Sequence, residues 1–371
     1  MKKKEQSVEE IVNAFTFDSA EKVLKLSDNN VFSPVSLYCA LAIMTACADG
    51  GTVKNRMLDF LHLDSEDELR CICRELIKDF GALVSGEHQK VILNNSVWIS
   101  DRCDEDPAIK SITADFEAFL DKVDFTHEAS PDRISQWVED KTNGLIRPDL
   151  EFDSKTLMVI INTLYFRGVW NYFYPDETEP DDFHRADGTI VKTPFMDTAV
   201  WDNYASLDHC KVISMDLGDN CEMRCVLPDE GVLPSDLLLD KETYQKAMTV
   251  IPDRYADIRL RIPKMDIRTH IDVVTEARKL GLDRIIKDMT FDQVLHERTI
   301  MNKVIHDTRI KVDEDGVEGA AMTEIQADIL GLPDFPDEKV ELVFNRPFLF
   351  GIYERKTSTW LFLGVYGDPA K

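Results

Sequence analysis

The chain has 371 residues, of which 44% are hydrophobic and 9% aromatic, enough to bury a sizeable core. Lys and Arg total 43 against 69 Asp and Glu, so the formal net charge at pH 7 is −26. A field of that sign repels phosphate backbones and anionic lipid surfaces, which argues against nucleic acid and membranes as partners.

Neither a linker nor an internal repeat divides the chain, so we expect one domain over residues 1–371. The N-terminal MKKKEQSVEE has the basic start of a signal peptide without an apolar run behind it, and no stretch reaches the roughly 18 apolar residues of a membrane helix. A cytoplasmic location is the expectation from these residues alone. The cysteines form no C-x-x-C pair of the kind found at zinc or redox sites, so we expect reduced, structural thiols.

The first part of the chain is predicted to be mainly helical. Ser7 and Glu10 form a capping box before an apolar stretch. Ser33-Pro34 begins a second helix, VSLYCALAIMTACA, which stops at Gly50-Gly51 and is apolar nearly all round, so it should be deeply buried. Thr52 is predicted to cap a third helix.

Helices and a strand are predicted to follow. Ser65 and Glu68 form a second capping box. KVILNNSVWIS (90–100) alternates as a strand, with Val91, Leu93, Val97 and Ile99 in phase. Helices are then expected over 107–123 and 130–146, each beginning with a proline signal.

From residue 155 onward the pattern is that of strands. KTLMVIINTLYFRGVW (155–170) is an apolar run typical of a central strand. Asp187-Gly188 and the GDN at 218–220 are predicted hairpin turns, and 256–267 alternates cleanly. A helix over 273–280 should stop at Gly281.

Two strands, over 340–353 and 359–366, are predicted to close the chain. Helices first and mostly antiparallel strands later indicate an α+β protein.

No motif of an enzyme or metal site is present in the sequence. The nucleophile elbow, zinc-protease, phosphate-loop and dinucleotide patterns are all missing. DEDGVEG (313–319) resembles a calcium loop, but placing Gly316 sixth puts Lys311 first and Met322 twelfth, which are not ligands. We therefore expect neither an enzyme nor a metal or other cofactor.

The segment 312–330, VDEDGVEGAAMTEIQADIL, is the most informative part of the sequence. After an acidic turn, residues 317–329 follow a period of two, the pattern of a strand with one buried face. The inward positions are mostly small at the start: Val317, Gly319, Ala321, Thr323, Ile325, Ala327 and Ile329. Two interpretations remain open, a constitutive strand and a strand held in reserve that slides between two neighbours already in place.

Several ordered segments resemble the serpin family, whose members are serine protease inhibitors. They are NVFSPVSLYCALAIMTACADGGT (30–52), NTLYFRGVW (162–170), IPKMDI (262–267), VDEDGVEGAAMT (312–323) and FNRPFLFGI (344–352). The resemblance covers nearly the whole chain. It implies a single serpin domain over 1–371, with helices packed on large, mostly antiparallel sheets and an exposed reactive-centre loop over 313–339.

The resemblance implies a suicide-substrate mechanism. A target serine protease is expected to acylate itself at the loop, after which 317–329 inserts as a new sheet strand. Counting along the family's loop from Gly316 places the scissile bond at Leu330-Gly331, with Ile329 as the neighbouring candidate. An apolar Leu330 suits elastase-, chymotrypsin- or subtilisin-like proteases.

The resemblance also assigns positions that control insertion. The hinge comprises Glu314, Gly316, Val317, Glu318, Gly319, Ala320, Ala321 and Thr323, with no proline or charge on its inward face. The sheet-opening positions are Ser33, Ser36, Asn162 and His306, a polar cluster beneath the sheet, together with Trp170 and Lys264 at the point of insertion. We further expect Lys264 to pair with Glu314.

The implied partner is a target serine protease in a covalent acyl complex with a monomeric inhibitor. No basic helix patch for heparin is present, so no heparin dependence is expected. The family resemblance implies an extracellular location, in contrast to the cytoplasmic expectation above. The alternative function is a non-inhibitory serpin-fold protein, which acts as a carrier, a chaperone or a plain protease substrate.

Overall fold

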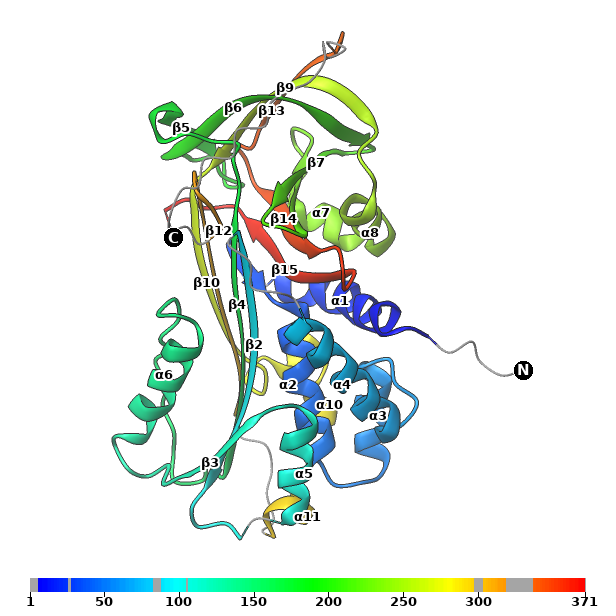
Figure 1. Cartoon of the computed structure of the whole chain (residues 1–371), viewed down its shortest axis with the longest axis vertical. Coiled ribbons are helices and arrows are strands. Elements are labelled where there is room, and N and C mark those ends of the chain that lie inside the picture. Colours follow the sequence, from blue (N-terminus) through cyan, green and yellow to red (C-terminus); the bar gives the residue numbers. More distant parts are fainter. Residues whose placement is uncertain are drawn as a thin grey trace, which may run out of the picture.

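The structure is a computed structural model that describes residues 6–25, 28–82, 88–104, 106–296, 303–317 and 336–370. Within these ranges the strands form a six-stranded and a nine-stranded sheet, with helices packed mainly against the first (Figure 1). This is the α+β architecture that the order of helix and strand patterns predicted.

The six-stranded sheet is built around one strand that is buried along nearly its whole length. β4 (Met158–Val169) is apolar almost throughout, as a strand covered on both faces must be. It pairs with β2 (Gln89–Ser100) in antiparallel register along nearly its whole length. The order across this sheet is β10 (Met265–Asp272), β11 (Lys303–Asp313), β12 (Gly316–Val317), β4, β2 and β3 (Phe119–Val123).

Helices cover both faces of this sheet (Figure 1). On one face lie α1 (Val8–Leu24), α2 (Pro34–Cys47), α3 (Thr52–Phe60), α4 (Glu66–Ala82) and α5 (Pro107–Asp115). Every residue of α2 is buried, because this helix runs through the middle of the main core. On the other face α6 (Ser130–Lys141) covers a second apolar core, in which Ile134 and Val138 join Val159 and Ile161 of β4 and Ile305 of β11.

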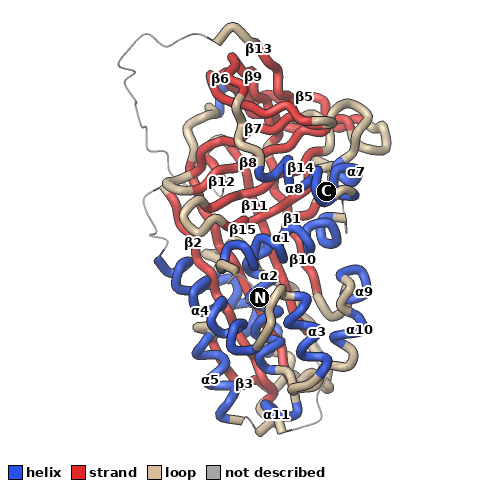
Figure 2. The backbone as a smooth tube through the Cα atoms, turned by 90° about the vertical axis from the view of Figure 1, so that its right-hand side faces the viewer, coloured by secondary structure: helices blue, strands red, loops and turns tan. Residues whose placement is uncertain are grey.

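The nine-stranded sheet fills the other end of the molecule, where Figure 2 places β6, β9 and β13. Its order is β1 (Asn30–Phe32), β15 (Thr359–Tyr366), β14 (Phe348–Glu354), β8 (Cys221–Pro228), β7 (Cys210–Leu217), β6 (Ile190–Leu207), β9 (Arg254–Pro263) and β13 (Lys339–Val343), with β5 (Thr178–His184) paired to β6. The predicted turns at Gly188 and Gly218 are confirmed, and both glycines have positive φ.

Short helices complete the chain. They are η1 (Pro175–Glu177), α7 (Pro234–Leu239), α8 (Lys241–Thr249), α9 (Ala277–Leu280), α10 (Asp283–Ile286) and α11 (Asp292–Leu295). The helix predicted over 273–280 is formed only in its last turn, and it ends at Gly281 in the left-handed conformation, as expected. None of the helices in the described ranges is long and apolar enough to cross a bilayer.

Three predictions of one continuous element were wrong, and so was the cap at Thr52, because Gly51 occupies the N-cap position of α3. The alternating stretch 256–267 is divided between β9 and β10, which belong to different sheets. The helix expected over 107–123 ends at Asp115, because Glu117 adopts a positive φ that breaks it, and 119–123 instead forms β3 at the sheet edge. The strand expected over 340–353 is two strands that pair with different neighbours, β13 in parallel with β9 and β14 with β8 and β15. The break falls at Asn345–Pro347, where proline removes a ladder donor.

All eight cysteines are free thiols, seven of them buried and Cys71 exposed. Burial raises the pKa of the Cys39 and Cys47 thiols to about 12, so both stay protonated and pack as small apolar side chains.

Candidate functional site

The boundary between β4 and β11 is called the seam below. The two strands pair directly at one end of the seam and are apart at the other end. Lys303–His306 of β11 pair directly, in parallel, with Val159–Asn162 of β4. At the opposite end β12 lies between the same two strands and is antiparallel to both. No strand pairing joins 163–167 of β4 to 307–311 of β11 within the described residues. The seam therefore contains the beginning of an additional strand.

Gly316, the first residue of β12, fits its position only as glycine. Its φ is +135°, a conformation that L side chains rarely adopt, and a Cβ atom there would lie 2.2 Å from the carbonyl oxygen of Gly168. Gly316 pairs with Val169 on one side and Asp313 on the other. The family resemblance assigned Gly316 to the hinge. The structure adds a second reason for a glycine here, because the backbone of β4 approaches too closely to leave room for a side chain.

The turn that leads into β12 is held by side chains from three other segments. Glu314 accepts hydrogen bonds from Lys264 Nζ and Thr178 Oγ1, each at 2.7 Å. The indole N–H of Trp170 donates to the carbonyl oxygens of Asp313 and Glu314, both at 3.0 Å. The expected Lys264–Glu314 pair is thus formed, whereas Thr178 was not identified from the sequence.

Electrostatics keep the Glu314 side chain ionised in this setting. Its side chain is 10% exposed, and burial alone would raise its pKa. The hydrogen bonds from Lys264 and Thr178 outweigh that effect and hold the pKa of Glu314 below its usual value. Burial raises the pKa of the neighbouring Asp313, and the hydrogen bond from the Asp315 N–H offsets this effect only in part.

A fully buried polar cluster lies where the direct pairing of β4 and β11 ends. It consists of Ser33, Ser36, Asn95, Asn162 and His306. The Ser33 N–H donates to His306 Nε2 at 3.2 Å, and the Ser36 hydroxyl, 3.5 Å from His306 Nδ1, donates to Asn162 Oδ1. The four residues predicted from the sequence are therefore brought together.

Asn95 completes the cluster from β2 and was missed. Asn162 Nδ2 donates to Asn95 Oδ1, and Asn95 Nδ2 donates to the Phe116 carbonyl oxygen at 2.9 Å. The sequence did contain a signal, because Asn95 interrupts the apolar phase of Val91, Leu93, Val97 and Ile99. A polar residue in phase with buried apolar ones is expected to have a buried partner.

His306 is neutral in the folded protein. Complete burial lowers its pKa to about 4, more than Asp307 raises it. Because Nε2 accepts the Ser33 N–H, the ring proton belongs on Nδ1, toward Ser36. His306 and Asn162 are the last directly paired residues of the seam, so separating β4 from β11 breaks this pair and rearranges the cluster.

The other predicted hinge positions and the predicted reactive bond lie outside the described residues. These are Glu318, Gly319, Ala320, Ala321 and Thr323 of the hinge, and Leu330-Gly331 with its neighbour Ile329. The described chain resumes at residue 336, just before β13. Nothing in the described ranges groups three or more His, Cys, Asp or Glu side chains so that they could hold a metal ion.

Comparison with known proteins identifies the family. The profile of the family described as Serpin (serine protease inhibitor) matches residues 10–369. The chain belongs to the serpin family. At the level of the family, serpins are protease inhibitors rather than catalysts.

Relatives cover almost the whole of this serpin. Serpin-Z1 of Arabidopsis thaliana is 30% identical, over 99% of this chain and 95% of the relative. The structure described as Arabidopsis AtSerpin1 in its native stressed conformation is 26% identical, with a TM-score of 0.82 and coverage of 99% of this chain and 100% of that chain.

Two further structures share the fold at 22% identity. The native thermophilic serpin tengpin has a TM-score of 0.84, with coverage of 99% of this chain and 96% of that chain. Thyroxine-binding globulin in complex with thyroxine has a TM-score of 0.82, with coverage of 97% of this chain and 99% of that chain. The serpin fold is thus established for this chain.

Proposed function

We propose that this serpin inhibits serine endopeptidases as a suicide substrate. The protease cleaves the loop 313–339 near Leu330-Gly331 and forms an acyl ester with the newly freed carbonyl carbon. Residues 317–329 then insert between β4 and β11, carrying the protease with them. The observation that carries this proposal is β12, which is paired on both sides at one end of the seam while the other end remains closed.

The register of β12 supports a continued insertion. Val317 pairs with Gly168 of β4 and with Val312 of β11. Each later residue would pair one position further back along both strands. Extension in this register places Thr323 between Asn162 and His306, which pair directly in the uninserted sheet.

The same register matches small loop residues to bulky neighbours. Gly319 would enter between Phe166 and Ile310, which are 3% and 2% exposed and belong to the main core. Ala321 would follow beside Leu164, which is 1% exposed. The space between β4 and β11 is already lined by large buried side chains, so only small inward residues of the inserted strand would fit there.

Energetics favour an irreversible trap. Insertion of 317–329 adds about a dozen backbone hydrogen bonds, each worth roughly 0.5–1.5 kcal/mol net. The driving force is then on the order of 10 kcal/mol, comparable to the whole stability of an ordinary fold. The uninserted form would persist for kinetic reasons.

The proposed targets are elastase-, chymotrypsin- or subtilisin-like proteases, because Leu330 suits an apolar specificity pocket. The proposed inhibitor is monomeric and independent of heparin. The alternative is a non-inhibitory serpin that acts as a carrier, a chaperone or a plain substrate. A structure described as binding thyroxine has the same fold, so fold similarity alone does not separate these functions.

The direct test is to mix the protein with pancreatic elastase or chymotrypsin and analyse the products by denaturing gel and mass spectrometry. We expect an adduct that survives denaturation, together with a released peptide that starts near Gly331. Nicked chain without an adduct would point to the non-inhibitory alternative.

A further inference from the structure

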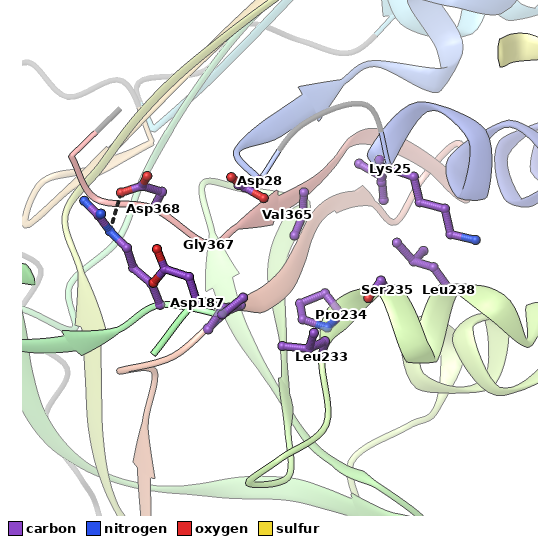
Figure 3. Close-up of a pocket in the computed structure, with 14 residues that line it drawn as sticks. Lys25, Asp28, Asp187, Leu233, Pro234, Ser235, Leu238, Val365, Gly367 and Asp368 are labelled. Carbon is purple, nitrogen blue, oxygen red and sulfur yellow. Dashed lines mark ion pairs between the residues drawn. The ribbon is translucent and has the colours of Figure 1, made fainter. Parts of the chain in front are cut away.

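A pocket of about 760 Å³ lies away from the seam, between the end of α1, the β5–β6 turn, the start of α7 and the segment after β15. Figure 3 places Asp187 and Asp368 at one end of this pocket and Lys25 and Leu238 at the other, with Pro234 and Val365 between them. Its size is in the range of sites for small organic ligands.

The middle of the pocket is apolar. Leu24, Leu238 and Val365 line it and are 2%, 2% and 6% exposed, so they form a fixed wall that belongs to the main core. Pro234 and Pro347 extend this wall, and Leu233 is 37% exposed. A ligand with an apolar body would bury surface here without any rearrangement of the core.

One end of the pocket carries a polar anchor of zero net charge. Arg185 Nε lies 2.7 Å from Asp368 Oδ1, and Asp368 is itself buried and accepts the Ala370 N–H at 3.0 Å. Within the described ranges Asp368 is the only side chain that forms an ion pair with Arg185, although Asp187 also lies within electrostatic range of it. The terminal N–H groups of its guanidinium can therefore donate to a ligand.

The other charged side chains of the pocket disfavour an anionic ligand. Asp187, whose pKa is lowered chiefly by the hydrogen bond from the Thr189 hydroxyl, and Asp28 would both repel an anion. The overall charge of −26 acts in the same direction. An alkylammonium group carries only donors, so it cannot accept a hydrogen bond from Arg185.

We propose that this pocket binds a small neutral amphiphile, a molecule with an apolar body and a carbonyl oxygen that accepts a hydrogen bond from Arg185. The apolar part lies on Leu24, Leu238 and Val365. This binding is independent of the protease-trapping function, since the pocket shares no residue with the seam or the hinge.

Three probes with the same eight-carbon chain test the proposal by titration calorimetry: octanamide, octanoate and octylammonium. We expect octanamide to bind at least about ten-fold more tightly than the other two. Equal or tighter binding of either charged probe would overturn the proposal, and so would no heat of octanamide binding up to about 10 mM.

Two tryptophan substitutions on α7 test whether octanamide binds in this pocket. Ser235→Trp adds bulk at an exposed position that lines the pocket, and it should weaken octanamide binding about ten-fold or more. Leu239→Trp is the matched control, because Leu239 is 70% exposed and does not line the pocket. Equal octanamide affinities of the two variants would place the ligand elsewhere and contradict the proposal.

Discussion

At the scale of single residues, two positions at the seam have roles that depend on contacts far away in sequence. Gly316 lies against the backbone of β4, and His306 lies against the start of α2. The sequence singled out both through family resemblance. The physical reasons, a backbone contact in one case and complete burial in the other, could not be derived from local pattern, because each depends on which distant segment packs there.

A methyl group at residue 316 should be poorly tolerated. In Gly316→Ala the new Cβ meets the Gly168 carbonyl oxygen at 2.2 Å, so β12 must leave the sheet or β4 must shift. We expect a loss of about 2 kcal/mol more than in Gly188→Ala, which also has positive φ but open space around it. The check is the midpoint of urea unfolding. Equal losses in the two variants would mean that the close approach is unimportant.

The buried His306 should make the native state sensitive to acid. Its folded pKa of about 4 lies below the ordinary value of 6.5, so between these pH values the unfolded chain binds a proton that the folded protein does not. Stability is therefore lost as pH falls through this window, by about 3 kcal/mol in total.

Replacement of the ring tests this titration. His306→Gln should flatten the dependence of the urea midpoint on pH between 6.5 and 4, relative to the parent protein. His184→Gln, at an exposed histidine of β5, should leave that dependence unchanged. An unchanged slope in His306→Gln would show that other groups dominate acid sensitivity.

At the scale of elements, regular periodicity predicted long strands and helices well. β2, β4, α2 and the hairpin turns lie where alternation, apolar runs and glycine signals placed them. The predictions failed at 107–123, 256–267 and 340–353, where one continuous pattern contains two elements. The second element in each case pairs with strands that are distant in sequence, which a local pattern does not reveal.

An arginine at residue 323 should prevent insertion at the polar cluster. In the register of β12, Thr323→Arg brings a cation against neutral His306 and fully buried Asn162, where its desolvation is costly. We expect the adduct with elastase or chymotrypsin to fall by at least about ten-fold in favour of simple cleavage. Gel densitometry of adduct against nicked chain measures this ratio.

The control at the same position is a substitution that keeps the volume of the side chain and removes its hydroxyl group. Thr323→Val should retain most of the adduct, because valine is similar in volume and suits a strand. If Thr323→Arg traps protease as efficiently as the parent protein, insertion either stops before residue 323 or follows another register.

At the scale of the whole molecule, a full insertion would change the stability of the entire fold. After cleavage in the loop we expect the midpoint of thermal unfolding to rise by about 10 °C or more, because the seam gains a complete strand. Scanning calorimetry of intact and cleaved protein measures this rise. The cleaved Thr323→Arg variant should gain much less. A cleaved parent protein that melts at the original temperature would contradict the trapping mechanism.

The second apolar core beneath α6 has a consequence for the rate at which a strand could insert between β4 and β11. Val159 and Ile161 belong to β4 and Ile305 to β11, yet α6 covers all three with Ile134 and Val138. A new strand would move β4 and β11 apart by about 4.8 Å, so this cluster cannot remain intact while the sheet widens. Transient exposure of these side chains to water would create a barrier to insertion, and its height would set how long an acylated protease has to escape.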